Sequence, residues 1–189
     1  MISFIHSPNT INEFNSVLEN YLFETSRLRF RHMTMEDVPA MIELNSDPLV
    51  VQYTGDGAFE SAQQAEEFFA GRLKQYAEDG YGRWIVELKD SNEIIGWCGL
   101  KLHRDTNETD LGYRFYRKFW NKGFGYEAGL ATIQFGFGKL QLKRIYAEAR
   151  KENVASWKIM EKCGMKFLCN SSGCDGETVI YEIFTDGNQ

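Results

Sequence analysis

The sequence lacks the excess of basic residues that nucleic-acid-binding domains usually carry. Among its 189 residues, 27 Asp and Glu outnumber 21 Lys and Arg, and the net charge is -6. It has no stretch near the roughly 20 apolar residues of a membrane span. Its start, Met1 to Leu22, does not show the basic segment and apolar run of a secretory signal. We therefore expect a cytoplasmic protein that binds neither nucleic acid nor membrane.

Cysteine is also scarce, and its spacing matches no zinc motif. Without an export signal, reduced thiols in or near the core are expected, with no metal site. The hydrophobic fraction is 43%, and there are no repeats or low-complexity linkers, which predicts one folded domain over residues 24–189. Residues 1–23 are interpreted as an N-terminal extension. Its apolar side chains recur at helical spacing, which predicts a helix packed on the domain: Ile11, Phe14, Val17, Leu18, Tyr21 and Leu22.

Alternating and helical patterns predict a mixed order of strands and helices after the extension. A strand over residues 28–32 is followed by a helix opened by Thr34 and a second helix from Ser61 to a stop at Gly80. The second helix is expected to turn Ala65, Phe68, Phe69, Leu73 and Tyr76 inward. The remaining strands are predicted over 84–88, 94–100, 110–116 and 144–150 and around 167 and 179–184, with helices over 125–137 and 153–163. The fold class is therefore mixed α/β, with a six- to seven-stranded sheet flanked by about four helices.

A glycine-bearing loop between a strand and a helix, Lys122 to Ala128, is the first candidate site. Glycines let the backbone approach a ligand closely, and the start of the next helix favours an anion such as a pyrophosphate. The spacing Gly123-x-Gly125-x-x-Ala128 also satisfies a loose dinucleotide fingerprint. That interpretation is disfavoured because residues 117–121 separate the loop from the preceding strand.

The second candidate site is the helix over residues 153–163. Asn153 is a good N-cap residue, and Gly164 is a good C-terminal stop. Its apolar stripe is explained by an amphipathic helix packed on a sheet, so the periodicity alone indicates no function.

Five ordered segments resemble the GNAT superfamily of N-acetyltransferases, in the branch of the ribosomal-protein N-terminal acetyltransferases. They are residues 24–31 (ETSRLRFR), 95–100 (IGWCGL), 110–113 (DLGY), 120–128 (WNKGFGYEA) and the helix at 153–165 (NVASWKIMEKCGM). The resemblance covers residues 23–184. It implies a single GNAT-like domain in which two splayed parallel strands, 110–116 and 144–150, form a cleft for acetyl-CoA. Trp120 departs from the fuller superfamily pattern, which has Gln or Arg at that position.

The resemblance implies specific binding residues. For acetyl-CoA as co-substrate these are Phe115, Tyr116, Arg117, Lys122, Gly123, Phe124, Gly125, Tyr126, Asn153 and Ser156. A backbone N–H near Phe115 or Tyr116 would polarise the acetyl oxygen. Candidate residues for shaping the acceptor pocket are Tyr53, Asp56, Trp97 and Tyr113.

Direct transfer to an amine also needs a group that takes a proton and a group that stabilises the departing thiolate. Asp110 and Glu148 are the candidate bases. The family's usual tyrosine donor is replaced by Met160, which cannot donate a proton, so Ser156 is the candidate for stabilising the thiolate.

Three functions remain open from the sequence. The first is an N-acetyltransferase acting on a primary amine, at a protein N-terminus or on a small molecule. The second is a noncatalytic acyl-CoA-binding module, favoured by the missing tyrosine at Met160. The third, a nicotinamide-dependent oxidoreductase, rests on the glycine spacing alone. The chain could act as a monomer or a homodimer.

Overall fold

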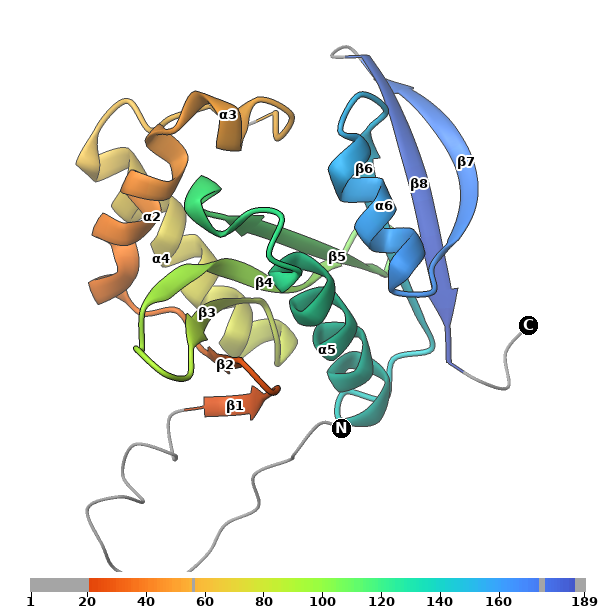
Figure 1. The fold of residues 1–189 in the computed structure, drawn as a ribbon, viewed down its shortest axis with the longest axis horizontal. Helices are drawn as coiled ribbons and strands as arrows, with labels where there is room; N and C mark the ends of the chain where they lie inside the picture. The colour runs from red at the N-terminus through yellow and green to blue at the C-terminus, as the bar shows by residue number, and fades with distance from the viewer. Residues whose placement is uncertain (1–20, 56, 174–175, 186–189) are drawn as a thin grey trace, which may run out of the picture.

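The computed structural model describes residues 21–55, 57–173 and 176–185, and these residues contain one eight-stranded sheet (Figure 1). The strand order is β1-β2-β3-β4-β5-β6-β8-β7. The strands are β1 (Tyr21–Glu24), β2 (Leu28–Arg31), β3 (Arg83–Leu88), β4 (Ile94–His103), β5 (Glu108–Phe115), β6 (Arg144–Arg150), β7 (Lys166–Gly173) and β8 (Gly176–Phe184).

Five α-helices flank this sheet within the described residues: α2 (Val38–Ser46), α3 (Pro48–Val51), α4 (Ala62–Asp79), α5 (Phe124–Gly138) and α6 (Val154–Lys162). Two short 3-10 turns precede α2 and α5, at Met35–Asp37 and Arg117–Phe119. The predicted caps form. Ser61 Oγ accepts from the Gln64 N–H at 3.1 Å, and Gly80 ends α4 with a φ of 79°. The mixed α/β fold expected from the sequence is confirmed.

The sheet has a hydrophobic core on each face. Trp84 and Val86 of β3 belong to the larger core, under α5 and α6, where Phe23, Phe30 and Phe135 stack nearby. Ile85 points the other way, into a smaller core formed with α2 and α4. Figure 1 shows these helical groups around the sheet, with α2 to α4 on one side of the picture and α6 on the other. This alternation follows from the two-residue period of a strand.

The strands β5 and β6 form the sheet's parallel pair and share one pair of Cα partners, Asp110 with Tyr146. By contrast, β4 and β5 pair antiparallel from Gly96–Phe115 to His103–Glu108. Beyond Asp110 the two parallel strands therefore separate. This is the splayed pair that the resemblance implies, and it leaves one edge of β5 unpaired toward its C-terminal end.

Two predictions about the start of the chain and α4 are corrected. Residues 21–23, expected to end a helical extension, instead belong to β1, which pairs with β2 and buries Phe23. The other residues of the extension lie outside the described part of the chain. Phe68, expected to point inward, is 38% exposed, although Ala65 and Phe69 are buried as predicted.

Candidate functional site

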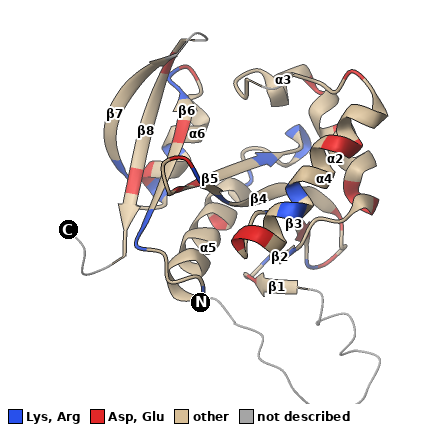
Figure 2. Cartoon of the chain, turned by 180° about the vertical axis from the view of Figure 1, so that it is seen from behind, with Lys and Arg blue, Asp and Glu red and all other residues tan. Residues whose placement is uncertain are grey.

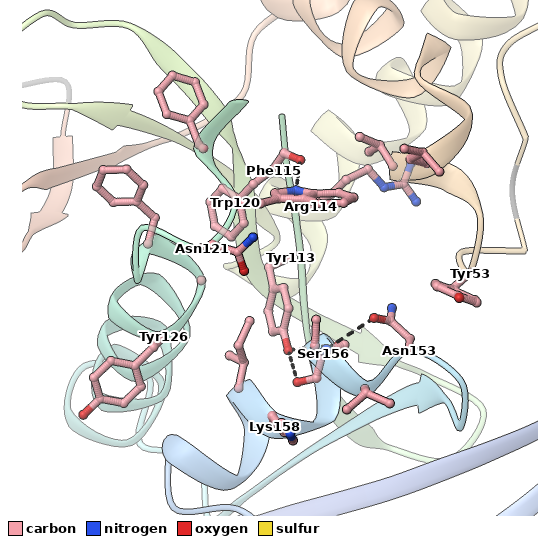
Figure 3. A pocket seen from close by; sticks show the side chains of 18 of the residues that line it. Tyr53, Tyr113, Arg114, Phe115, Trp120, Asn121, Tyr126, Asn153, Ser156 and Lys158 are labelled. Atoms are coloured by element: carbon pink, nitrogen blue, oxygen red, sulfur yellow. Dashed lines mark hydrogen bonds between the residues drawn. The ribbon is translucent and has the colours of Figure 1, made fainter. Parts of the chain in front are cut away.

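A cavity of about 660 Å³ lies where β5 and β6 separate (Figure 3). Four parts of the chain line it: α3 with the residues after it, the end of β5, the start of α5 with the loop before it, and one side of α6 with the residues before it. The lining residues are Leu49, Val50, Gln52, Tyr53, Thr54, Tyr113, Arg114, Phe115, Phe119, Trp120, Asn121, Gly123, Phe124, Gly125, Tyr126, Glu152, Asn153, Val154, Ala155, Ser156, Lys158, Ile159 and Lys162.

The start of α5 forms one wall of the cavity. Gly123, its N-cap residue, has a φ of 80°, a left-handed conformation that glycine adopts without steric cost. The first N–H groups of a helix have no partner within the helix, and the helix dipole favours a negative group beside them. Gly123 to Tyr126 all line the cavity, so this wall can bind an anion.

A hydrogen-bonded cluster joins the start of α5 to the turn between β1 and β2. The Glu127 carboxylate accepts from Thr25 Oγ1 at 2.6 Å and from Arg27 Nε at 2.6 Å. Burial would raise the pKa of Glu127, but these hydrogen bonds outweigh it and lower the pKa below the usual 4.5. The Arg27 guanidinium also stacks on Phe124, 4.3 Å from the ring centroid. The sequence reasoning did not identify this cluster, although it used the same segment, residues 24–31, for the family resemblance.

The backbone of β5 presents an N–H to the open edge at Phe115. The Tyr116 N–H donates to Ile95 O at 3.0 Å on the β4 side. Hydrogen-bonding groups alternate between the two edges of a strand, so the Phe115 N–H points toward the splayed side. Tyr116 is therefore not the residue that offers a free amide, and its hydroxyl donates to Ala40 O on α2 at 2.5 Å.

Trp120, the departure from the superfamily pattern, ties the loop to this strand. Its indole N–H donates to Phe115 O at 2.8 Å, and the residue lines the cavity. The bond holds the segment before Gly123 close to the end of β5. Trp120 thus ties the loop to β5, a role that the Gln or Arg of the superfamily pattern does not predict.

Tyr113 crosses the cavity from β5 to the first turn of α6 (Figure 3). Its hydroxyl donates to Ser156 O at 2.9 Å and lies 3.1 Å from Ser156 Oγ. The Ser156 N–H donates to the Asn153 side chain at 3.3 Å, which caps the helix. Burial raises the pKa of Tyr113 strongly, so this hydroxyl stays protonated near neutral pH. Tyr113 was expected in the acceptor pocket, but the structure places its hydroxyl against Ser156.

The two candidate bases lie outside the lining of the cavity. Asp110 accepts from Arg83 Nη2 at 2.6 Å, and the distance from its other carboxylate oxygen to His103 Nε2 is 3.1 Å. Glu148 is exposed on β6 and forms no ion pair within the described ranges. Burial raises the pKa of Tyr146 to about 12, and the nearby charges of Asp110 and Glu148 contribute to the rise. The structure therefore brings Asp110 and Glu148 to one face of the sheet, around Tyr146.

Most of the predicted cofactor residues come together, but several do not. Phe115, Gly123, Phe124, Gly125, Tyr126, Asn153 and Ser156 line the cavity, whereas Tyr116, Arg117 and Lys122 do not. Arg117 instead pairs with Asp47 at 3.0 Å, and the Lys122 ammonium lies 5.5 Å from the centroid of the Phe119 ring. Of the predicted acceptor residues, Tyr53 and Tyr113 line the cavity and Trp97 does not. Asp56 lies outside the described residues.

Some lining residues gave no recognisable signal in the sequence. Leu49 and Val50 belong to α3, a four-residue helix too short for a periodic pattern. Arg114 is buried on β5, next to Asn45 and 5.5 Å from the Trp97 ring centroid. The alternation of β5 could have indicated that Arg114 faces away from Tyr113. It could not have indicated that both reach one cavity.

Two kinds of feature are absent from the described part of the chain. No helix there is long and apolar enough to cross a membrane. The same residues contain no group of three or more His, Cys, Asp or Glu that could hold a metal ion. Acidic and basic residues occur on both the helices and the sheet (Figure 2).

Comparison with known proteins adds independent information. A family model described as an acetyltransferase (GNAT) domain matches residues 27–166. An uncharacterized N-acetyltransferase, p20 of Bacillus licheniformis, is 32% identical over 137 residues, which cover 72% of this chain and 77% of that protein. The crystal structure of a GNAT-family acetyltransferase from Bacillus anthracis matches with a TM-score of 0.75 at 26% identity, covering 85% of this chain and 96% of that chain.

A more distant structure is the spermidine N-acetyltransferase of Vibrio cholerae in complex with CoA and spermine. It has a TM-score of 0.73 at 20% identity and covers 85% of this chain and 96% of that chain. At that identity the likeness shows the fold alone.

Proposed function

The chain belongs to the GNAT acetyltransferase family, and from this premise we propose that it transfers an acetyl group from acetyl-CoA directly to a primary amine, on a small molecule or at a peptide N-terminus. Enzymes of this family use acetyl-CoA, which is therefore the co-substrate. One observation carries the proposal. The cavity joins an anion-binding helix start to the open edge of a splayed strand and to the Ser156 hydroxyl.

The residues present fit acetyl-CoA. The N–H groups at the start of α5, from Gly123 to Tyr126, would hold the pyrophosphate. The open edge of β5 offers backbone groups for the pantetheine amides, as an added strand would use them. Lys158 and Lys162 line the α6 side and supply positive charge for phosphate.

The co-substrate supplies a thioester whose carbonyl carbon accepts the amine nitrogen while the carbon–sulfur bond breaks. The Phe115 N–H is our candidate for donating to the carbonyl oxygen as it gains negative charge. Ser156 is our candidate for donating to the thiolate, because Met160 is buried and has no proton to give. Holding both reactants in one cavity lowers the entropic part of the barrier.

The amine must lose a proton, and we propose Glu148 as its acceptor in preference to Asp110. Asp110 is held by Arg83 on one carboxylate oxygen and by His103 on the other, and it does not line the cavity. Glu148 has no such partner within the described residues and shares the same face of the sheet. Because Glu148 does not line the cavity, a water molecule would carry the proton from the amine to the Glu148 carboxylate.

The acceptor is a primary amine. The distant spermidine acetyltransferase makes polyamines one class to test, and the resemblance to ribosomal-protein acetyltransferases makes peptide N-termini another. On the α3 side the cavity is lined by the neutral side chains of Leu49, Val50 and Tyr53, and Arg114 of β5 also lines it. These residues favour an amine with an apolar neighbour over one with several positive charges.

A thermal-shift titration with acetyl-CoA, CoA, NAD and ATP tests the cofactor. A ligand at about 100 times its dissociation constant stabilises the folded state by about 2.7 kcal/mol, which raises the midpoint by several degrees. We expect acetyl-CoA and CoA to give this shift and NAD to give none. A shift with NAD alone would contradict the proposal.

Thiol release with a panel of polyamines, aminoglycosides and peptides of varied N-terminal residue then tests the transfer. Mass spectrometry of the acceptor should show the gain of one acetyl group. The alternative is a noncatalytic acyl-CoA-binding module, for which the buried Met160 is the supporting observation. That alternative predicts the CoA-dependent shift without thiol release for any acceptor.

A further inference from the structure

The hydroxyl of Tyr113 on β5 points toward Ser156 on α6, and both residues line the cavity (Figure 3). It reaches α6 from β5, across the gap left by the splayed strands. Its oxygen lies 2.9 Å from Ser156 O and 3.1 Å from Ser156 Oγ. Both distances are within hydrogen-bonding range.

These two contacts constrain the Ser156 proton. A tyrosine hydroxyl has one proton and can also accept. When Tyr113 donates to Ser156 O, the Ser156 hydroxyl donates to Tyr113. When Tyr113 donates to Ser156 Oγ, the Ser156 O–H bond is free to turn its proton toward the cavity. The two arrangements interconvert by rotating O–H bonds, with no movement of heavier atoms.

Further contacts hold the Ser156 backbone and the Tyr113 ring in place. The Asn153 side chain accepts from the Ser156 N–H, which holds the first turn of α6. The Tyr113 ring lies 6.4 Å from the ring of Phe115, whose N–H points to the open edge of β5. Tyr113 therefore joins the proposed oxygen-binding amide to the proposed thiolate-binding hydroxyl through one rigid strand.

We infer that Tyr113 is a positioning residue that holds the Ser156 hydroxyl and lets its proton turn toward the sulfur of the co-substrate. The inference rests on the proposed function, because it requires a sulfur beside Ser156. Burial raises the pKa of Tyr113, so it remains a neutral donor while a thiolate is present.

Binding of CoA and of desulfo-CoA, measured by calorimetry at about pH 9, tests the inference without any turnover. The sulfur of bound CoA, as thiol or thiolate, can accept a hydrogen bond from the Ser156 hydroxyl, and desulfo-CoA has no such atom. We therefore expect the natural protein to bind CoA about 10-fold more tightly than desulfo-CoA. We expect Ser156→Ala and Tyr113→Phe each to bring the ratio to within about twofold of one, and the double variant to add nothing further.

Tyr181→Phe is the matched control. Tyr181 is buried and Tyr113 is half-buried, and both hydroxyls donate to α6. The Tyr181 hydroxyl donates to Glu161 Oε1 at 3.0 Å, but Tyr181 does not line the cavity. It should lower the melting temperature as much as Tyr113→Phe does and leave the binding ratio unchanged. The kcat for acetyl transfer should fall about 10-fold in Tyr113→Phe, with the KM for acetyl-CoA nearly constant.

The outcomes separate this inference from the proposed function. If the natural protein binds no CoA, the proposed function fails, and the inference fails with it. If Ser156→Ala loses the preference for CoA while Tyr113→Phe keeps it, the proposed function stands and the inference is overturned. If the natural protein shows no preference at all, neither residue acts on the sulfur, which also overturns the inference.

Discussion

At the scale of single residues, the left-handed backbone at Gly123 carries the anion-binding start of α5. Alanine costs about 1 kcal/mol in this conformation, and a backbone shift that relieves the strain moves the N–H groups at the start of α5. We expect Gly123→Ala to lower the free energy of unfolding by about that amount and to weaken CoA binding at least 10-fold. Chemical denaturation and calorimetry measure the two effects.

Gly164→Ala is the control for this prediction. Gly164 has a φ of 87°, similar to that of Gly123, but follows α6 and does not line the cavity. Gly164→Ala should lower the free energy of unfolding by a similar amount and leave the affinity for CoA unchanged. Equal losses of affinity in both variants would show that strain alone, rather than the loop at the cavity, controls binding.

Substitutions of Asp110 and Glu148 should have different effects, one mainly on stability and the other mainly on catalysis. Asp110 and Arg83 form a 2.6 Å ion pair with side chains only 13% and 11% exposed. Asp110→Asn should therefore lower the free energy of unfolding by about 2 kcal/mol, because Arg83 loses its charged partner. Glu148→Gln, at an exposed position, should change stability by less than about 0.5 kcal/mol.

For catalysis, Glu148→Gln should have the larger effect and Asp110→Asn the smaller one. Glu148→Gln should lower kcat about 100-fold and remove the rise of activity with pH that a general base produces. Urea denaturation and a pH profile of acetyl transfer measure both quantities in parallel. If Asp110→Asn abolishes transfer while Glu148→Gln does not, Asp110 is the base.

At the scale of elements, Glu127 links α5 to the turn between β1 and β2. Its pKa is lowered in the folded protein, so its contribution is fully present above about pH 4.5 and is lost as the pH falls through the lower folded value. Glu127→Gln should lower the free energy of unfolding by about 1–2 kcal/mol at pH 7. Stability curves from pH 7 to pH 3 should show the natural protein and the variant converging below about pH 4.5. A constant difference down to pH 3 would contradict the assigned role.

Elements with strong local signals could be predicted from the sequence, and others could not. The caps at Ser61, Gly80 and Asn153 mark helix ends that the structure has. β1 was wrongly predicted as helix because Tyr21 and Leu22 fit a helical period, while its strand conformation depends on pairing with β2. That pairing is a tertiary effect, which overrides local pattern.

The residues of the candidate site also separate into those that local sequence signals predict and those that depend on contacts distant in the sequence. The glycine loop and the cap at Asn153 are local features, and the structure places them at one cavity. Tyr116 could not be distinguished from Phe115, because only the β4 pairing determines which amide is free. Arg27 and Glu127 are 100 residues apart, and no pattern in the sequence indicates that they meet.

At the scale of the whole molecule, the splayed strands predict where a bound cofactor changes backbone protection. The N–H of Phe115 faces the open edge, whereas the N–H of Tyr116 is bonded to β4. Hydrogen exchange should therefore slow on CoA binding at Phe115 and in the first turn of α5, and change little at Tyr116. Exchange resolved by NMR can separate the neighbouring amides. Protection of Tyr116 without Phe115 would contradict the predicted direction of the β5 backbone.

The position of β8 has a consequence for synthesis of the chain on the ribosome. β8 lies between β6 and β7, so the antiparallel partner of β6 is the last of the described strands to be synthesised. Until residues 176–184 leave the exit tunnel, β6 has only its single pair with β5, and α6 lacks the β8 surface on which it packs. The first five strands can assemble earlier, since their pairings are complete by Phe115. The α6 wall with Ser156 should therefore fold later than the other walls of the cavity, once residues 176–184 have left the exit tunnel.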